Sequence, residues 1–200
     1  MNRIILLLVI LQGSVTFSIA QEDKMTKLPY HQIPDYPSEY SPCNAIARMV
    51  DGLGYRYYWA TEGLRDEDLT YKPSEKGRTT LETLEHIHGL TSVLVNATRK
   101  EPNIRSSSDD PLSFKELRVK TLQNIKEASD ILKSSSQEDL DEFIMEFKRE
   151  DGSTKYPFWN MLNGPLADAI SHVGQVVSFR RSSGNPIHPG VRVLLGKTTE

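Results

Sequence analysis

Cysteine is almost absent from this 200-residue chain, because Cys43 is the only one. A single cysteine excludes an intramolecular disulfide and any zinc site built mainly from thiolates. Any metal chemistry must therefore come mostly from the histidines. There are five of these: His31, His86, His88, His172 and His188.

The chain also has no long basic run and no common catalytic signature. Its 24 Lys and Arg residues stand against 27 Asp and Glu residues, and the formal net charge of -3 argues against nucleic acid as the main partner. The sequence contains no GxSxG, HExxH, P-loop or GxGxxG motif. Cys43 stands at a proline-flanked position without a local activating group, so we interpret it as an inert thiol.

No apolar run is long enough to span a membrane. The run Ile4–Leu11 has eight residues, whereas a spanning helix needs ~20. It follows the basic Arg3 and is closed by the small residues Ser18 and Ala20, an arrangement typical of a secretory signal. The sequence therefore predicts a signal peptide over 1–20 and an exported, periplasmic or extracellular protein. An uncleaved N-terminal anchor is the alternative.

Two segments with prolines flank the expected domain. Residues 21–43 contain four prolines and three tyrosines, which predicts an extended arm whose tyrosines lie against the domain. Residues 187–200 predict an extended C-terminal tail. The domain itself is expected over 44–186, with polar connections over Arg65–Gly77 and 101–112.

Hydrophobic periodicity between these segments predicts four helices. They are Asn44–Leu64, Thr79–Lys100, Ser113–Ser134 and Pro157–Arg181. The pairs Thr79 with Glu82 and Ser113 with Glu116 are capping-box signals, and Gly164-Pro165 predicts a break in the last helix. Alternation over Glu142–Lys148 and Thr154–Phe158 around a turn predicts a hairpin. The expected architecture is all-α, a four-helix bundle with a small β-hairpin between the third and fourth helices.

The last helix carries an acid and a histidine one turn apart. Asp168 and His172 are four residues apart, so both side chains can bind the same divalent ion. They can equally form an ordinary pair on a helix surface. Arg180 and Arg181 at the end of this helix can bind an anion, although a helix C-terminus favours cations in any case.

The second helix offers two histidines, and the pattern does not choose between them. His86 and His88 are two residues apart, so on a helix they diverge by about 200° and cannot both face one ion. Each borders the apolar stripe on a different side. For either histidine, the alternative to a metal ligand is an ordinary histidine that packs at the edge of the core. His31 and His188 stand in proline-rich segments and are interpreted as surface or packing residues.

Several of these motifs together resemble the DinB-like (DinB/YfiT-like) family. The resemblance rests on Leu84-Glu85-His86-Ile87, on Asp168-Ala169-Ile170-Ser171-His172-Val173-Gly174-Gln175, on Phe179–Pro186 and on Gly54–Ala60. It covers roughly Asn44 to Pro186 and implies an up-down-down-up four-helix bundle. Family members typically hold one divalent metal with a histidine on the second helix and two residues, usually histidines, four apart on the fourth.

Carried over by position, the resemblance implies His86, Asp168 and His172 as metal ligands. Asp168 stands where a histidine is usual, but a carboxylate also binds divalent ions. Two imidazoles and one carboxylate suit zinc, nickel, manganese or iron(II) and leave coordination positions open. Gln175, near His172, is expected to support that ligand by hydrogen bonding. The resemblance also suggests a homodimer.

Three hypotheses follow for function. The first is an exported metal-dependent enzyme that acts on an unidentified small molecule, a hydrolase or a transferase, with a metal-bound water. The second is a metal- or ligand-binding bundle without turnover. The third is a metal-free structural module in which Asp168 and His172 form an ordinary pair. A metal site that is open beside a concave pocket would favour the first hypothesis. A site sealed by side chains would favour the second. If His86 and His172 point apart, only the third remains.

Overall fold

The computed structural model describes residues 27–104 and 111–199. The expected signal peptide over 1–20 lies outside these residues, as do 105–110 of the expected loop. Among the described helices, none combines the length and the apolar character needed to cross a membrane.

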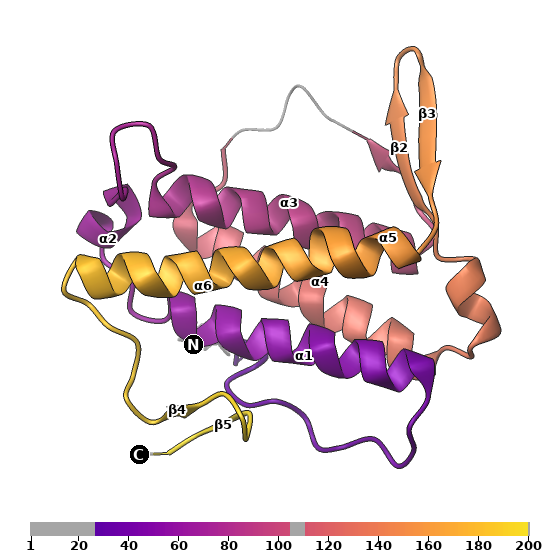
Figure 1. Cartoon of the computed structure of the whole chain (residues 1–200), viewed down its shortest axis with the longest axis horizontal. Coiled ribbons are helices and arrows are strands. Elements are labelled where there is room, and N and C mark those ends of the chain that lie inside the picture. The colour runs from indigo at the N-terminus through magenta and orange to yellow at the C-terminus, as the bar shows by residue number, and fades with distance from the viewer. Residues whose placement is uncertain (1–26, 105–110, 200) are drawn as a thin grey trace, which may run out of the picture.

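Four long helices lie side by side and form the bundle (Figure 1). They are α1 (Pro42–Thr61), α3 (Thr80–Thr98), α4 (Phe114–Ser134) and α6 (Ala167–Ser182). α1 and α3 each pack against both α4 and α6. α1 and α6 run in one direction and α3 and α4 in the other (Figure 1), which confirms the up-down-down-up arrangement.

Both predicted capping boxes are present, and they determine the residues at which α3 and α4 begin. The hydroxyl of Thr79 accepts from the backbone N–H of Glu82 at 3.1 Å, and the Glu82 carboxylate accepts from the Thr79 N–H at 2.7 Å. Ser113 and Glu116 make the same reciprocal pair at the start of α4. Each box satisfies N–H groups that the first helical turn leaves without a partner.

The core fills the space between the four helices with aliphatic side chains. Its most buried members include Leu53, Leu84, Leu94, Leu122, Ile125 and Val176. Tyr30, from the arm, also packs into it and lies directly on α1, because a Cβ at Gly54 would stand 2.4 Å from the Tyr30 ring. The Tyr30 hydroxyl donates to buried Asp51 at 3.0 Å. Burial next to this carboxylate raises the pKa of Tyr30 well above its usual range, so the hydroxyl stays a donor.

The rest of the arm meets the expectation only in part. Tyr36 and Tyr40 are 79% and 105% exposed, so they do not lie against the domain as Tyr30 does. The C-terminal tail is not simply extended either. β4 (Val191–Arg192) pairs antiparallel with β5 (Lys197–Thr198), and the Ile33 N–H donates to the Gly196 carbonyl at 2.8 Å, which joins arm and tail.

The predicted hairpin between α4 and α6 is present. β2 (Met145–Arg149) pairs antiparallel with β3 (Gly152–Tyr156), after a short 3-10 turn, η1 (Glu138–Asp141). A strand that the sequence did not predict, β1 (Asn103–Ile104), adds parallel to β2 from within the expected loop. Two residues that pair only with a distant strand give no periodic signal of their own.

The last helix is broken where Gly164-Pro165 predicted. α5 (Trp159–Met161) passes into a π-helical turn, η2 (Leu162–Leu166), and then into α6. Gly164 has non-helical angles, φ -94° and ψ -108°, and Pro165 has no N–H to donate. The break lies one turn before Asp168 and hollows the surface beside it.

The expected polar connection Arg65–Gly77 contains a short helix, α2 (Asp66–Thr70), which corrects that prediction. Asp68 fixes it in place. Its buried carboxylate accepts from the Arg65 guanidinium at 2.8 and 2.9 Å, from the Ser183 hydroxyl at 2.6 Å and from the Asn185 amide at 2.6 Å. These hydrogen bonds, the one from Arg65 foremost, hold the pKa of Asp68 far below its usual range. The carboxylate thus ties α2 to the end of α6.

Because the pKa of Asp68 is depressed in the folded state, its contribution to stability is present above the unfolded pKa of ~4 and is lost as the pH falls. We expect Asp68→Asn to lower the free energy of unfolding by about 2 kcal/mol at pH 7. The difference in free energy of unfolding between the variant and the wild type should become smaller below pH ~4. Urea melts from pH 7 to 3 measure this, with the exposed Asp66→Asn as control. A gap that stays constant over this range would contradict the assignment.

Candidate metal centre

The two neighbouring helices α3 and α6 bring the three predicted ligands together. His86 comes from the second turn of α3, and Asp168 and His172 from the first two turns of α6. The Nε2 atom of His86 lies 3.2 Å from Asp168 Oδ2, and the Nε2 atom of His172 lies 3.4 Å from Asp168 Oδ1. The two imidazole rings are perpendicular, with their centroids 4.7 Å apart. His86 and His172 do not point apart, which is the arrangement that would have left only the third hypothesis.

The donor atoms of this trio lie close to the arrangement that one divalent ion requires. One potential ligand atom from each residue lies within 4.8 Å of the others. With metal–ligand bonds of ~2.0–2.2 Å, two ligands of one ion lie at most ~4.4 Å apart, so small side-chain movements suffice. Two nitrogens and a carboxylate oxygen are also donors that first-row divalent metals accept. The residues present therefore fit such an ion.

Gln175 holds the ring of His172. Its Oε1 atom lies 3.0 Å from His172 Nδ1. An amide oxygen accepts, so this contact favours the tautomer that carries the proton on Nδ1 and leaves Nε2 for a metal. In that tautomer the ring would bind a metal through Nε2.

The structure decides between the two histidines of α3. His86 faces α6, whereas His88 faces α4, where its Nδ1 lies 3.1 Å from the Thr121 hydroxyl. Thr121 donates to the Leu117 carbonyl, so it accepts from His88. Burial lowers the pKa of His88 and favours the neutral ring. His88 is thus a satisfied histidine at the core edge, and His86 is the one available to a metal.

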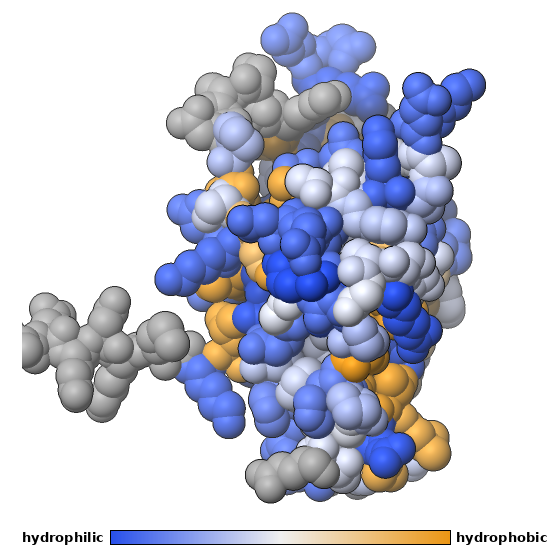
Figure 2. All heavy atoms as spheres, turned by 90° about the vertical axis from the view of Figure 1, so that its left-hand side faces the viewer, coloured by the Kyte–Doolittle hydropathy of each residue, from blue (hydrophilic) through white to orange (hydrophobic). Residues whose placement is uncertain are grey.

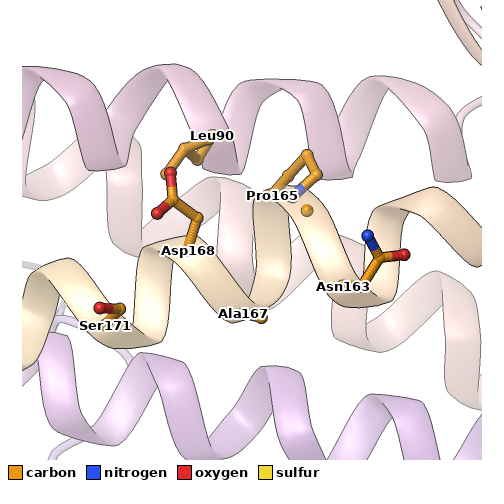
Figure 3. A pocket seen from close by; sticks show the side chains of 7 residues that line it. Leu90, Asn163, Pro165, Ala167, Asp168 and Ser171 are labelled. Atoms are coloured by element: carbon orange, nitrogen blue, oxygen red, sulfur yellow. The ribbon is translucent and has the colours of Figure 1, made fainter.

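The site is open to solvent on one side. The side chains of Asp168 and His86 are 46% and 33% exposed, and that of His172 is 15% exposed. Beside Asp168 lies an open depression of about 500 Å³, which the helix break at Gly164 and Pro165 helps to form (Figure 3). Asn163 and Ser171 add an amide and a hydroxyl to its lining. A small molecule can therefore reach the Asp168 carboxylate.

The other residues that the sequence offered as candidates pack against neighbouring side chains or bind backbone carbonyls. Cys43 is buried and donates to the Ser136 carbonyl at 3.1 Å, and burial raises the pKa of its thiol. His31 and His188 pack on Trp59, with ring centroids 5.0 and 5.8 Å away. Arg180 is buried and donates to backbone carbonyls at the end of α1, so it is not available to an anion.

These observations define a DinB-like four-helix bundle with a His-Asp-His cluster that could hold a metal ion between two of its helices. No family model and no curated protein matches the chain. Among solved structures, the chain is similar to the crystal structure of the DinB-like protein YjoA from Bacillus subtilis. The two are 18% identical, with a TM-score of 0.54, and the match covers 72% of this chain and 96% of that one. This likeness confirms the fold that the sequence motifs implied.

Proposed function

We propose that this chain is an exported metal-dependent enzyme, a hydrolase or a transferase, which holds one divalent ion with His86, Asp168 and His172. The observation that carries the proposal is the meeting of these three side chains at a solvent-open place. Zinc, nickel, manganese and iron(II) all accept two imidazoles and one carboxylate, and we propose one of these as the ion.

A bound ion supplies a Lewis acid and a water of lowered pKa. The chain's own residues supply orientation. Gln175 Oε1 contacts His172 Nδ1, and the two oxygens of Asp168 face one histidine each. The depression beside Asp168 offers a substrate a place with the Asn163 amide and the Ser171 hydroxyl as polar partners.

The alternative is a bundle that binds a metal or a ligand without turnover. A site sealed by packed side chains would favour it, because no reactant could then reach the ligands. The exposure of Asp168 and the depression beside it favour the enzyme instead.

Metal uptake and activity test the two parts of the proposal separately. Purified protein dialysed against each of the four metals is analysed for bound metal by mass spectrometry, and one ion per chain is expected. The loaded protein is then screened for hydrolysis of esters, amides and phosphate esters and for transfer to thiols, with a chelated sample as control. Uptake without any chelator-sensitive turnover supports the non-catalytic bundle, and no uptake contradicts a metal centre in either form.

The contact between Gln175 and His172 gives a prediction of its own. Gln175→Leu removes the acceptor of His172 Nδ1, so the ring is no longer held in the metal-binding tautomer. We expect the affinity for the preferred metal to fall about 10-fold, since lost support of a metal ligand typically costs 10–100-fold. Calorimetric titration measures this, with Gln123→Leu on the distant α4 as control. Unchanged affinity would show that Gln175 plays no part.

Export rests on the sequence of residues 1–20, and N-terminal sequencing of the protein recovered from outside the cytoplasm tests it. A chain that begins near Gln21 supports cleavage. A retained Met1 contradicts it.

A further inference from the structure

A second concave surface lies on the opposite flank of α6 from the metal centre. α1 and α6 lie side by side and the C-terminal segment returns along them (Figure 1), and between these three is a groove of about 290 Å³. Its walls are formed by Trp59, Ile170, Val177, Ile187, Val191 and Val193. Seen from the end of the bundle, hydrophobic surface gathers on the side that carries this segment, at the lower right of Figure 2. The metal ligands take no part in the groove.

Gly174 lines the groove without a side chain. A Cβ built at this position would meet no atom within 4 Å beyond its own helix, so no neighbour requires a glycine there. Glycine inside a helix costs ~1 kcal/mol relative to alanine. Any side chain at this position would extend into the groove.

The wall formed by the C-terminal segment is held in place. The Arg192 N–H donates to the Tyr55 hydroxyl at 3.2 Å, and this hydroxyl lies 2.9 Å from the Thr198 hydroxyl. Gly196 is joined to Ile33 of the arm by a backbone hydrogen bond. The groove is thus formed before any ligand enters, which lowers the ordering cost of binding.

Two arginines give the apolar groove a cationic part. Arg56 and Arg181 both belong to its lining. Arg56 donates to the Gly52 carbonyl at 3.1 Å, and neither arginine forms an ion pair with a carboxylate of residues 27–104 or 111–199. Guanidinium groups prefer planar anions such as carboxylates, to which they can donate two hydrogen bonds.

We propose that this groove binds an amphiphilic carboxylate, with its hydrocarbon chain along the aliphatic walls and its carboxylate at Arg56 and Arg181. Ligand pockets begin at ~300 Å³, so a groove of about 290 Å³ suits a small ligand such as a medium-length acyl chain. The apolar walls favour binding of the ligand's hydrocarbon chain. The two arginines favour a carboxylate over a neutral compound of equal length.

Trp59 lies in the groove and reports on its occupancy. The chain has two tryptophans, so Trp159→Phe leaves Trp59 as the single emitter. In this background and with a chelator present, so that the metal centre plays no part, octanoate is titrated against Trp59 fluorescence. We expect a saturable change, and 1-octanol should bind at least 10-fold more weakly. No saturable change with octanoate, or equal affinity for 1-octanol, would overturn the proposal.

Three further variants in the same background test the geometry. Gly174→Phe fills the groove and should abolish the octanoate response, whereas Gly174→Ala should keep it and raise the melting temperature. The double variant Arg56→Gln with Arg181→Gln should lower octanoate affinity to that of 1-octanol, a result that does not depend on the folding of Gly174→Phe. A response that survives both the filled groove and the lost arginines would place the ligand elsewhere. Sedimentation that shows a dimer broken by Gly174→Phe would assign the groove to a second copy.

Discussion

His172→Ala is expected to lower the affinity for a divalent metal by at least about 100-fold. The Nε2 atom of His172 lies 3.4 Å from Asp168 Oδ1 within the cluster, and loss of a ligand costs more than the 10–100-fold typical of lost support. Two remaining donors cannot enclose the ion as three do. Calorimetric titration with the metal that the wild type binds best measures the change.

The matched control for this variant is His188→Ala. His188 is exposed and packs on Trp59, away from the cluster. The His188→Ala variant should bind one metal ion per chain with the affinity of the wild type. Equal metal uptake by His172→Ala and wild type would show that bound metal lies elsewhere, and a loss in both variants would point to a general effect of removing histidines.

Arg180→Ala is expected to lower the free energy of unfolding by ~3–5 kcal/mol, the largest effect on stability that we predict for one side chain. Arg180 is 3% exposed. Its guanidinium donates to the carbonyls of Trp59, Ala60, Glu62 and Asn185 and to the Asn185 side chain, at 2.8 to 3.2 Å. Without it, the carbonyls that end α1 stay buried without these donors, and the ends of α1 and α6 lose their connection.

Its neighbour Arg181 provides the control. Arg181 is exposed and makes no ion pair among the described residues, so Arg181→Ala should change the free energy of unfolding by less than ~0.5 kcal/mol. Chemical denaturation of the two variants at the same pH gives the comparison. Similar stabilities for both would mean that the Arg180 hydrogen bonds contribute nothing beyond those the unfolded chain makes with water.

Local signals in the sequence predicted the helices and the hairpin well. Thr79 and Ser113 are found at the N-caps where the capping boxes placed them, and Gly164-Pro165 breaks the last helix. Each of these signals acts within a few residues through one hydrogen bond or one missing donor, so no knowledge of distant neighbours is needed.

Features that depend on distant partners were not predicted. β1 exists because Asn103 and Ile104 pair with β2 more than forty residues away, and α2 is fixed by Asp68 contacts to the end of α6. The role of Arg180 is of the same kind, since two of its acceptors, the carbonyls of Trp59 and Ala60, lie on α1. Arg180 and Arg181 look alike in the sequence, and only the packing of the bundle shows that one is buried.

The candidate site shows the same division. The spacing of Asp168 and His172 places both on one helix flank, which the sequence alone indicates. The choice of His86 over His88 came only from the family resemblance, because each borders the apolar stripe. The structure gives the physical reason, which is that His86 faces α6 and His88 faces Thr121 on α4.

The most direct test of this account is a crystal structure of the metal-loaded protein with anomalous data collected at the edge of the bound metal. A metal centre at these residues predicts one strong peak within ~2.0–2.3 Å of His86 Nε2, His172 Nε2 and an oxygen of Asp168. A peak at other residues, or protein that takes up no metal while His86 and Asp168 keep their 3.2 Å contact, would contradict it.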